Sequence, residues 1–149
     1  MDGWTPGRSE LAEVADGCAC KHLRRSARAV TQLYDETLRP SGLRITQFTL
    51  LVAVAIGEPV PITRLADALS LDRTTLGRDL KPLTDRGLVE IRAGDDRRTR
   101  VVRLTGPGRD ALGQAYPLWR SAQARIVERS SWPVLAAGLQ EVAAAARAS

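Results

Sequence analysis

The sequence predicts a mainly α-helical protein with one small β-hairpin, in the order of a winged helix-turn-helix. Three observations support this prediction. A short helix over 64–69 is followed, after a tight turn, by a longer helix that starts at Asp72. Two segments that alternate apolar and polar residues, 88–92 and 99–104, then flank a charged loop that contains glycine. Long helical stripes of apolar residues precede and follow this unit.

The helices before the unit are predicted from apolar spacing and from helix breakers. Over 10–38 the residues that recur at helical spacing are Leu23, Ala27, Val30, Tyr34 and Leu38. Pro40 and Gly42 are expected to end this helix. A second helix is expected from Thr46, a favourable N-cap residue, to Ile56. Because it is apolar nearly all round, we expect it to be buried.

Within the central unit, polar caps and helix breakers predict where each helix begins and ends. Thr63 is expected to cap the first helix and Asp72 the second. The buried stripe of the second helix is Leu76, Leu80 and Leu83. Gly87 stands where a helix-ending glycine is expected. Pro82 lies inside this helix and is expected to bend its C-terminal half, because proline removes a backbone donor.

After the hairpin, two more helices are expected. Thr105 is a plausible cap for the first, whose apolar stripe is Leu112, Ala115, Trp119, Ala122 and Ile126. Pro133 is expected to break the chain before a terminal helix over 134–146. The stripes on both sides of the central unit exceed what so small a core needs. They therefore predict a homodimer.

The composition is that of a globular chain with an arginine-rich surface. Its 149 residues have room for one domain, and 44% apolar with 26% charged residues argue against wholesale disorder. The formal net charge is +5, and arginine supplies 20 of the 22 basic residues. Because the guanidinium fork suits phosphates and guanine edges, nucleic acid is the first partner class to test.

Several classes of protein are excluded or lack support. The longest wholly apolar run is seven residues, over 50–56, against the roughly 20 needed to span a bilayer. No secretory signal is visible, so we expect a cytoplasmic protein with no membrane part. The single histidine, His22, cannot support a multi-histidine metal centre, and no nucleotide-binding or catalytic motif is present. No enzyme, metal or cofactor is therefore expected.

The first turns of the second helix present polar side chains opposite its leucine stripe. In a helix-turn-helix these turns enter the major groove of DNA. The expected DNA-contacting residues are Arg73, Thr74, Thr75, Arg78 and Lys81. Gly77 weakens the helix but lets DNA approach closely. The alternative is a solvated polar helix face.

The hairpin loop supplies a second set of expected DNA contacts. Arg97 and Arg98 stand at its tip, beside Asp96. A glycine-bearing tip that presents arginine fits a narrow minor groove. Asp96 is expected to hold a neighbouring arginine by a charge-assisted bond. The alternative is a solubilising hairpin.

The stretch over 69–112 resembles the core of the MarR family of transcriptional regulators. Its most specific piece is the run DRR-x-x-x-V-x-L-T, which starts at Asp96 and ends at Thr105. With the flanking helices the resemblance covers roughly 15–147. It implies a homodimer whose dimerisation region is formed by helices from both chain ends. It also implies that Arg98 is the wing-tip arginine, with Asp96 as its partner.

Together these features predict a transcriptional regulator, a homodimeric repressor that binds an inverted repeat in double-stranded DNA. We expect one MarR-type domain over 1–149, with dimerisation helices at about 10–40 and 107–147 and the winged unit at about 46–104. The half-sites are expected about 10 bp apart, one turn of DNA. Release is expected through an oxidant or a small-molecule effector. The alternative is a winged-helix protein-interaction module without specific DNA binding.

Cys18 and Cys20 leave three interpretations open. They are small apolar residues at a dimer interface, a redox sensor favoured by nearby cations, or a metal clip with His22. Cys20-x-x-Leu23 resembles the first helix of the MarR subgroup that senses organic hydroperoxides. That resemblance implies an oxidisable Cys20 and a thiolate-binding role for Tyr34. The usual family alternative is a ligand in the cleft between the two regions, for which the candidates are Arg28, Tyr116 and Trp119.

Overall fold

The computed structural model describes residues 5–96 and 98–148. The chain forms two compact units, one up to Leu33 and one from Tyr34 onward. The first unit contains α1 (Arg8–Gly17) and most of α2 (Ala19–Leu38). The single helix expected over 10–38 is therefore wrong. Cys18 separates the two helices with an extended backbone (φ −68°, ψ 107°), next to Asp16 and Gly17, which are poor helix formers.

The second unit contains the hydrophobic core. After the end of α2 and a short 3₁₀ helix, Arg39–Ser41, its helices are α3 (Ile45–Gly57), α4 (Ile62–Ala68), α5 (Arg73–Asp85), α6 (Gly106–Arg129) and α7 (Trp132–Arg147). The side chains with the least exposure come from α2 to α6 and from the strands. The largest of them are Leu38, Leu51, Leu65, Leu76, Leu80, Leu83, Val54, Val89 and Val102. As expected, α3 contributes strongly to this core, with four buried residues.

Two of the predicted helix caps are wrong. Helix α3 begins at Ile45, two residues before the position that a Thr46 cap requires. Its first amide, on Ile45, donates to the carboxylate of Asp35 in α2 at 2.8 Å, so a distant residue replaces the local cap. Helix α4 begins at Ile62 after Pro61, which leaves Thr63 inside the helix.

The predicted limits of α5 are confirmed. The Asp72 carboxylate accepts the amide of Thr75 at 2.9 Å and caps the helix. At the other end Gly87 has a positive φ of 68°, and the amide of Leu88 donates to the carbonyl of Leu83 at 2.9 Å. This is the arrangement that a glycine after a helix permits. The helix continues through Pro82 to Asp85.

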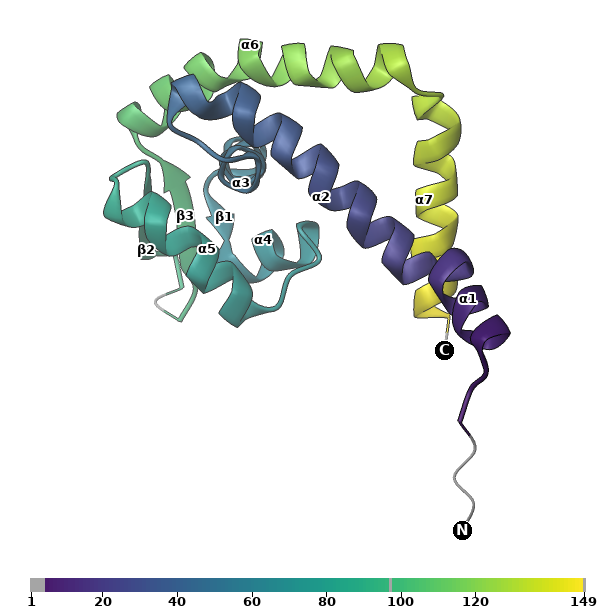
Figure 1. The fold of residues 1–149 in the computed structure, drawn as a ribbon. Helices are drawn as coiled ribbons and strands as arrows, with labels where there is room; N and C mark the ends of the chain where they lie inside the picture. Colours follow the sequence, from purple (N-terminus) through teal and green to yellow (C-terminus); the bar gives the residue numbers. More distant parts are fainter. Residues whose placement is uncertain (1–4, 97, 149) are drawn as a thin grey trace. The chain divides into compact units, whose positions relative to one another are not determined.

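The wing is part of a three-stranded antiparallel sheet with the order β1-β3-β2 (Figure 1). Strands β2 (Val89–Ala93) and β3 (Arg100–Leu104) form the predicted hairpin. Strand β1 (Val60–Pro61) was not predicted. It pairs with β3, Val60 opposite Val102, and leads directly into α4.

The start of α6 is hydrogen-bonded to the segment that connects α5 to β2. The Thr105 hydroxyl accepts the amide of Gly108 at 3.0 Å, as the predicted cap requires, and donates to the carbonyl of Gly87 at 2.6 Å. A Cβ atom added to Gly108 would lie 1.9 Å from the carbonyl oxygen of Leu88. Only glycine allows this approach of α6 to the strand.

The terminal helix α7 begins at Trp132, two residues before the predicted start. Pro133 lies in its first turn, where proline has no amide to lose, rather than in a break. None of the residues of α7 is buried.

Over the described residues, no single helix has both the length and the apolar character to cross a membrane. One pair of helices separated by a bend, Ala19–Ser41 with Ile45–Gly57, meets both conditions jointly, by length and composition alone.

Candidate nucleic-acid interface

Helix α5 separates its buried and its outward side chains along its length. Its leucine stripe is almost fully buried, between 0% and 2% exposed. The residues of the opposite face are exposed: Arg73, Thr74, Gly77, Arg78 and Lys81. The second helix of this helix-turn-helix therefore presents two arginines and a lysine to solvent.

Thr75 has a different surrounding from its neighbours. Its hydroxyl donates to the Asp72 carboxylate at 2.6 Å, and its amide donates to the same group. These two bonds hold the pKa of the Asp72 carboxyl below its ordinary value. The Arg78 guanidinium lies 3.4 Å from the Thr75 hydroxyl oxygen. Thr75 therefore contributes to the N-terminal cap of α5 and contacts Arg78, in addition to its position on the predicted DNA-contacting helix.

The cations on this surface differ in their partners. Lys81 is paired with Asp85 at 2.6 Å, although both side chains are more than half exposed. On the sheet, Arg92 is paired with Glu90 at 2.8 Å. Within residues 5–96 and 98–148, no ion pair involves Arg73, Arg78 or Arg98. These three guanidinium groups keep their charge available for an external anion.

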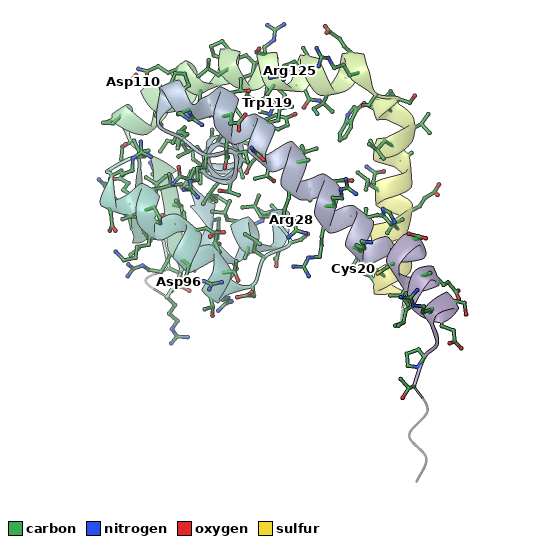
Figure 2. All side chains as sticks on the ribbon, viewed as in Figure 1. Cys20, Arg28, Asp96, Asp110, Trp119 and Arg125 are labelled. Atoms are coloured by element: carbon green, nitrogen blue, oxygen red, sulfur yellow. The ribbon has the colours of Figure 1, made fainter. Side chains whose placement is uncertain are left out.

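Asp96, labelled in Figure 2, lies in the loop between β2 and β3 and contacts the backbone of Arg98. The Asp96 carboxylate accepts the amide of Arg98 at 3.0 Å, and the Asp96 carbonyl accepts the amide of Thr99 at 2.8 Å. Asp96 therefore holds Arg98 by a charge-assisted bond to its backbone amide and shapes the turn that carries it. Arg98 is exposed, and Arg97 lies outside the described residues.

A polar cleft beside α5 was missed by the sequence reasoning. It is lined by Arg44, Thr46 and Gln47 at the start of α3 and by Arg78, Asp79 and Pro82 of α5, and it has a volume of about 410 Å³. Arg44 is exposed, and Gln47 accepts its backbone amide at 3.1 Å. A single arginine before a helix carries little signal in a sequence, so only the folded chain identifies this cleft.

Both cysteines are free thiols, Cys18 half-buried and Cys20 exposed. They line a cleft of about 430 Å³ with three cationic side chains, Lys21, Arg24 and Arg28. Figure 2 labels Cys20 and Arg28 on α2. Lys21 donates to the carbonyl of Ala15, and the Nε2 atom of His22 lies 2.7 Å from the carbonyl oxygen of Asp16.

The metal-clip interpretation gains no support from the described part of the chain. There, no three His, Cys, Asp or Glu side chains are grouped so that they could hold a metal ion.

Tyr34 belongs to the second unit, where it is 7% exposed. Its hydroxyl donates to the side-chain oxygen of Gln123 in α6. Burial raises the pKa of this hydroxyl above its ordinary value. The thiolate-binding role implied for Tyr34 stays a prediction.

An apolar cavity of about 610 Å³ lies against α3, the end of β3 and the first half of α6. Its apolar walls are formed by Val52, Ala55, Ile56, Leu104, Leu112 and Tyr116. Glu58 and Arg109, which form an ion pair, also line it. Tyr116 stacks on Trp119, and Trp119 on Phe48, each at 6.0 Å between ring centroids. Two of the three predicted cleft residues, Tyr116 and Trp119, are thus neighbours.

This fold, with an arginine-bearing outward helix face and an arginine-bearing wing, defines a winged helix-turn-helix transcriptional regulator. The profile of the MarR family matches residues 41–99. The chain is 41% identical to the transcriptional regulator MosR of M. tuberculosis, whose crystal structure is a complex with DNA. That match covers 87% of this chain and 98% of MosR, with a TM-score of 0.78. The chain belongs to the MarR family of helix-turn-helix transcriptional regulators.

Two further proteins are similar over different lengths. An uncharacterized HTH-type transcriptional regulator of Bacillus subtilis, YwoH, is 30% identical over 83 residues, which is 56% of this chain and 61% of YwoH. The match therefore spans less than two thirds of that relative. A mutant of E. coli MarR, solved in complex with operator DNA, has the same fold, with a TM-score of 0.77 at 21% identity over 93% of this chain and 99% of that one.

Membership of this family confirms that the chain is a regulator and not an enzyme.

Proposed function

We propose that this protein is a homodimeric repressor that binds an inverted-repeat operator in double-stranded DNA through α5 and the wing. The observation that carries the proposal is a set of exposed guanidinium groups on these two elements that form no ion pair with any described residue, Arg73, Arg78 and Arg98. In this arrangement α5 enters the major groove and the loop between β2 and β3 enters the minor groove. MosR and E. coli MarR have the same fold and were solved in complex with DNA, which supports this proposal.

The homodimer is supported by apolar side chains left exposed outside the winged unit. They are Leu11, Val14, Leu23 and Val30 in α1 and α2, and Val127, Val134, Leu135, Leu139 and Val142 in α6 and α7. Exposed apolar surface on this scale marks an interaction site. The proposal assigns about 10–40 and 107–147 to dimerisation and about 46–104 to DNA binding.

The test compares Arg98→Ala and Arg78→Ala in operator binding. The control is Arg8→Ala, at an exposed residue outside the regions assigned to DNA binding and dimerisation. Both variants should weaken binding. Arg98→Ala should also lower the slope of log affinity against log salt by about 1, whereas Arg78→Ala should relax base preference. A protein-interaction module predicts no sequence-specific affinity and no effect of Arg98→Ala, and that result would refute the proposal.

For release from DNA, the cysteine pair supports an oxidative switch. Cys18 and Cys20 line one cleft with the cationic side chains of Lys21, Arg24 and Arg28, and Cys18 has an extended backbone between the two helices. In the proposed step an organic hydroperoxide takes two electrons from the two thiols. A disulfide forms, the O–O bond breaks, and an alcohol and water leave. DNA affinity should fall with hydroperoxide and return with dithiothreitol, and Cys20→Ser should abolish the response.

The apolar cavity against α3 and α6 supports a second mode of release, by a small ligand with an apolar body. A variant with both Cys18→Ser and Cys20→Ser separates the two modes. If aromatic acids lower the operator affinity of this variant, the ligand mode holds without thiol chemistry. If neither oxidant nor aromatic acid changes the affinity of the wild-type protein, both modes are wrong.

A further inference from the structure

The polar cleft between the start of α3 and the middle of α5 brings together two arginines that are distant in sequence. Arg44 lies on one wall and Arg78 on the other, with the hydroxyl-bearing Thr46 beside Arg44. Arg44, Thr46 and Arg78 are all exposed. The cleft therefore opens to solvent with two guanidinium groups and a hydroxyl donor.

The charge of the cleft favours an anion. Asp79 is its one acidic side chain against two arginines. Over residues 5–96 and 98–148, no ion pair joins Asp79 to Arg44 or to Arg78. The carboxylate therefore reduces the positive potential of the cleft without occupying either guanidinium.

The position of the cleft relates it to the DNA-facing surface. Arg78 and Pro82 are one helical turn apart, so they lie on the same side of α5. Arg78 also belongs to the outward face with Arg73, Thr74 and Gly77. The cleft therefore borders the face that we assign to the major groove, where one sugar-phosphate backbone passes the helix.

We propose that this cleft binds a backbone phosphate of the operator. Arg44 is then a positioning residue that lies at the start of α3, outside both α5 and the wing. The proposal rests on the proposed function and deepens it. Arg44 and Thr46 donate to the phosphate oxygens from the α3 side, and Arg78 faces them from α5. A guanidinium suits this role because its fork matches two phosphate oxygens. A phosphate contact fixes the register of α5 without reading sequence.

The test measures the affinity of Arg44→Ala for the operator and for a scrambled duplex over a range of salt concentrations. Arg8→Ala is the control, because Arg8 is also exposed, does not line the cleft and lies outside the regions assigned to DNA binding and dimerisation. Arg44→Ala should weaken both duplexes by the same factor, about three- to tenfold, and lower the salt slope by about 1. Arg44→Lys, which keeps the charge, should recover part of the affinity at low salt.

The outcomes separate this proposal from the proposed function. If Arg44→Ala binds both duplexes as Arg8→Ala does, the phosphate contact is wrong while operator recognition stands. If Arg44→Ala weakens only the operator, Arg44 reads a base and the phosphate assignment is overturned. If the wild-type protein binds both duplexes equally and Arg44→Ala weakens both, the contact stands and the sequence-specific function fails. Thermal unfolding shows whether Arg44→Ala is folded, and Arg44→Gln repeats the measurement if it is not.

Discussion

At residue 77 the chain has a glycine that its own fold does not require. A Cβ atom added there would meet no other heavy atom within 4 Å, and the residue lies inside α5. A glycine inside a helix destabilises it by about 0.5–1 kcal/mol relative to alanine. Packing within the chain does not explain this cost, whereas the proposed binding of DNA by α5 does, because a missing side chain lets DNA approach closely.

Gly77→Ala should therefore separate stability from binding. We expect the free energy of unfolding to rise by about 0.5–1 kcal/mol, measured by urea denaturation, because the helix gains propensity. The operator affinity should fall, because the methyl group meets the DNA.

Gly113→Ala in α6 is the control, since a Cβ there also meets nothing within 4 Å. It should stabilise the fold and leave DNA affinity unchanged. Equal affinity of Gly77→Ala and the wild-type protein would mean that α5 does not approach DNA as closely as proposed.

The sequence was sufficient for residues whose partners are close in the chain. Asp72 caps α5 through an amide three residues away, and Thr105 caps α6 in the same manner, so both were predictable. Thr46 failed as a cap because Asp35, ten residues from Ile45, supplies the acceptor. Arg44 was missed for the same reason, since its significance depends on Arg78 across the cleft.

At the scale of an element, the entry to α6 depends on Gly108. The Leu88 carbonyl occupies the space that a side chain would need, and it also accepts the amide of Thr105 at 3.1 Å. A side chain at 108 must therefore displace the helix from the strand that follows α5.

Gly108→Ala should destabilise the protein by about 1–3 kcal/mol, the usual cost of overpacking, measured by urea denaturation. Gly106→Ala is a matched control, because it lies two residues earlier in α6 and a Cβ there meets nothing within 4 Å. A variant at 108 as stable as the one at 106 would show that α6 can move without cost.

Among the elements, the helices and the hairpin followed from periodicity, whereas β1 did not. One of its two residues is Pro61, and Gly57 and Pro59 precede it, so the sequence predicts a loop there. The segment is a strand because it pairs with β3. The break between α1 and α2 was also missed, because the apolar spacing begins only after it.

At the scale of the whole molecule, a homodimer makes recognition depend on the distance between two half-sites. We expect the half-sites about 10 bp apart, one turn of DNA. An insertion of about 5 bp between them rotates one half-site to the opposite face of the duplex. Operator affinity should then fall toward that for a single half-site, measured by fluorescence anisotropy.

A duplex of the original length with substituted central base pairs is the control, since it keeps the phase of the half-sites. If the insertion leaves the affinity unchanged, the protein does not bind as a two-fold dimer with fixed spacing.

The central position of β3 has a mechanical consequence. On one side β3 pairs with β2, which completes the wing, and on the other with β1, which runs straight into the first helix of the helix-turn-helix. The elements proposed to enter the minor and the major groove are thus joined through one sheet and its connection to α4. We therefore expect a signal to act on both elements together, by changing the separation or tilt of the two halves of the proposed dimer. Induction should then lower affinity for both grooves together.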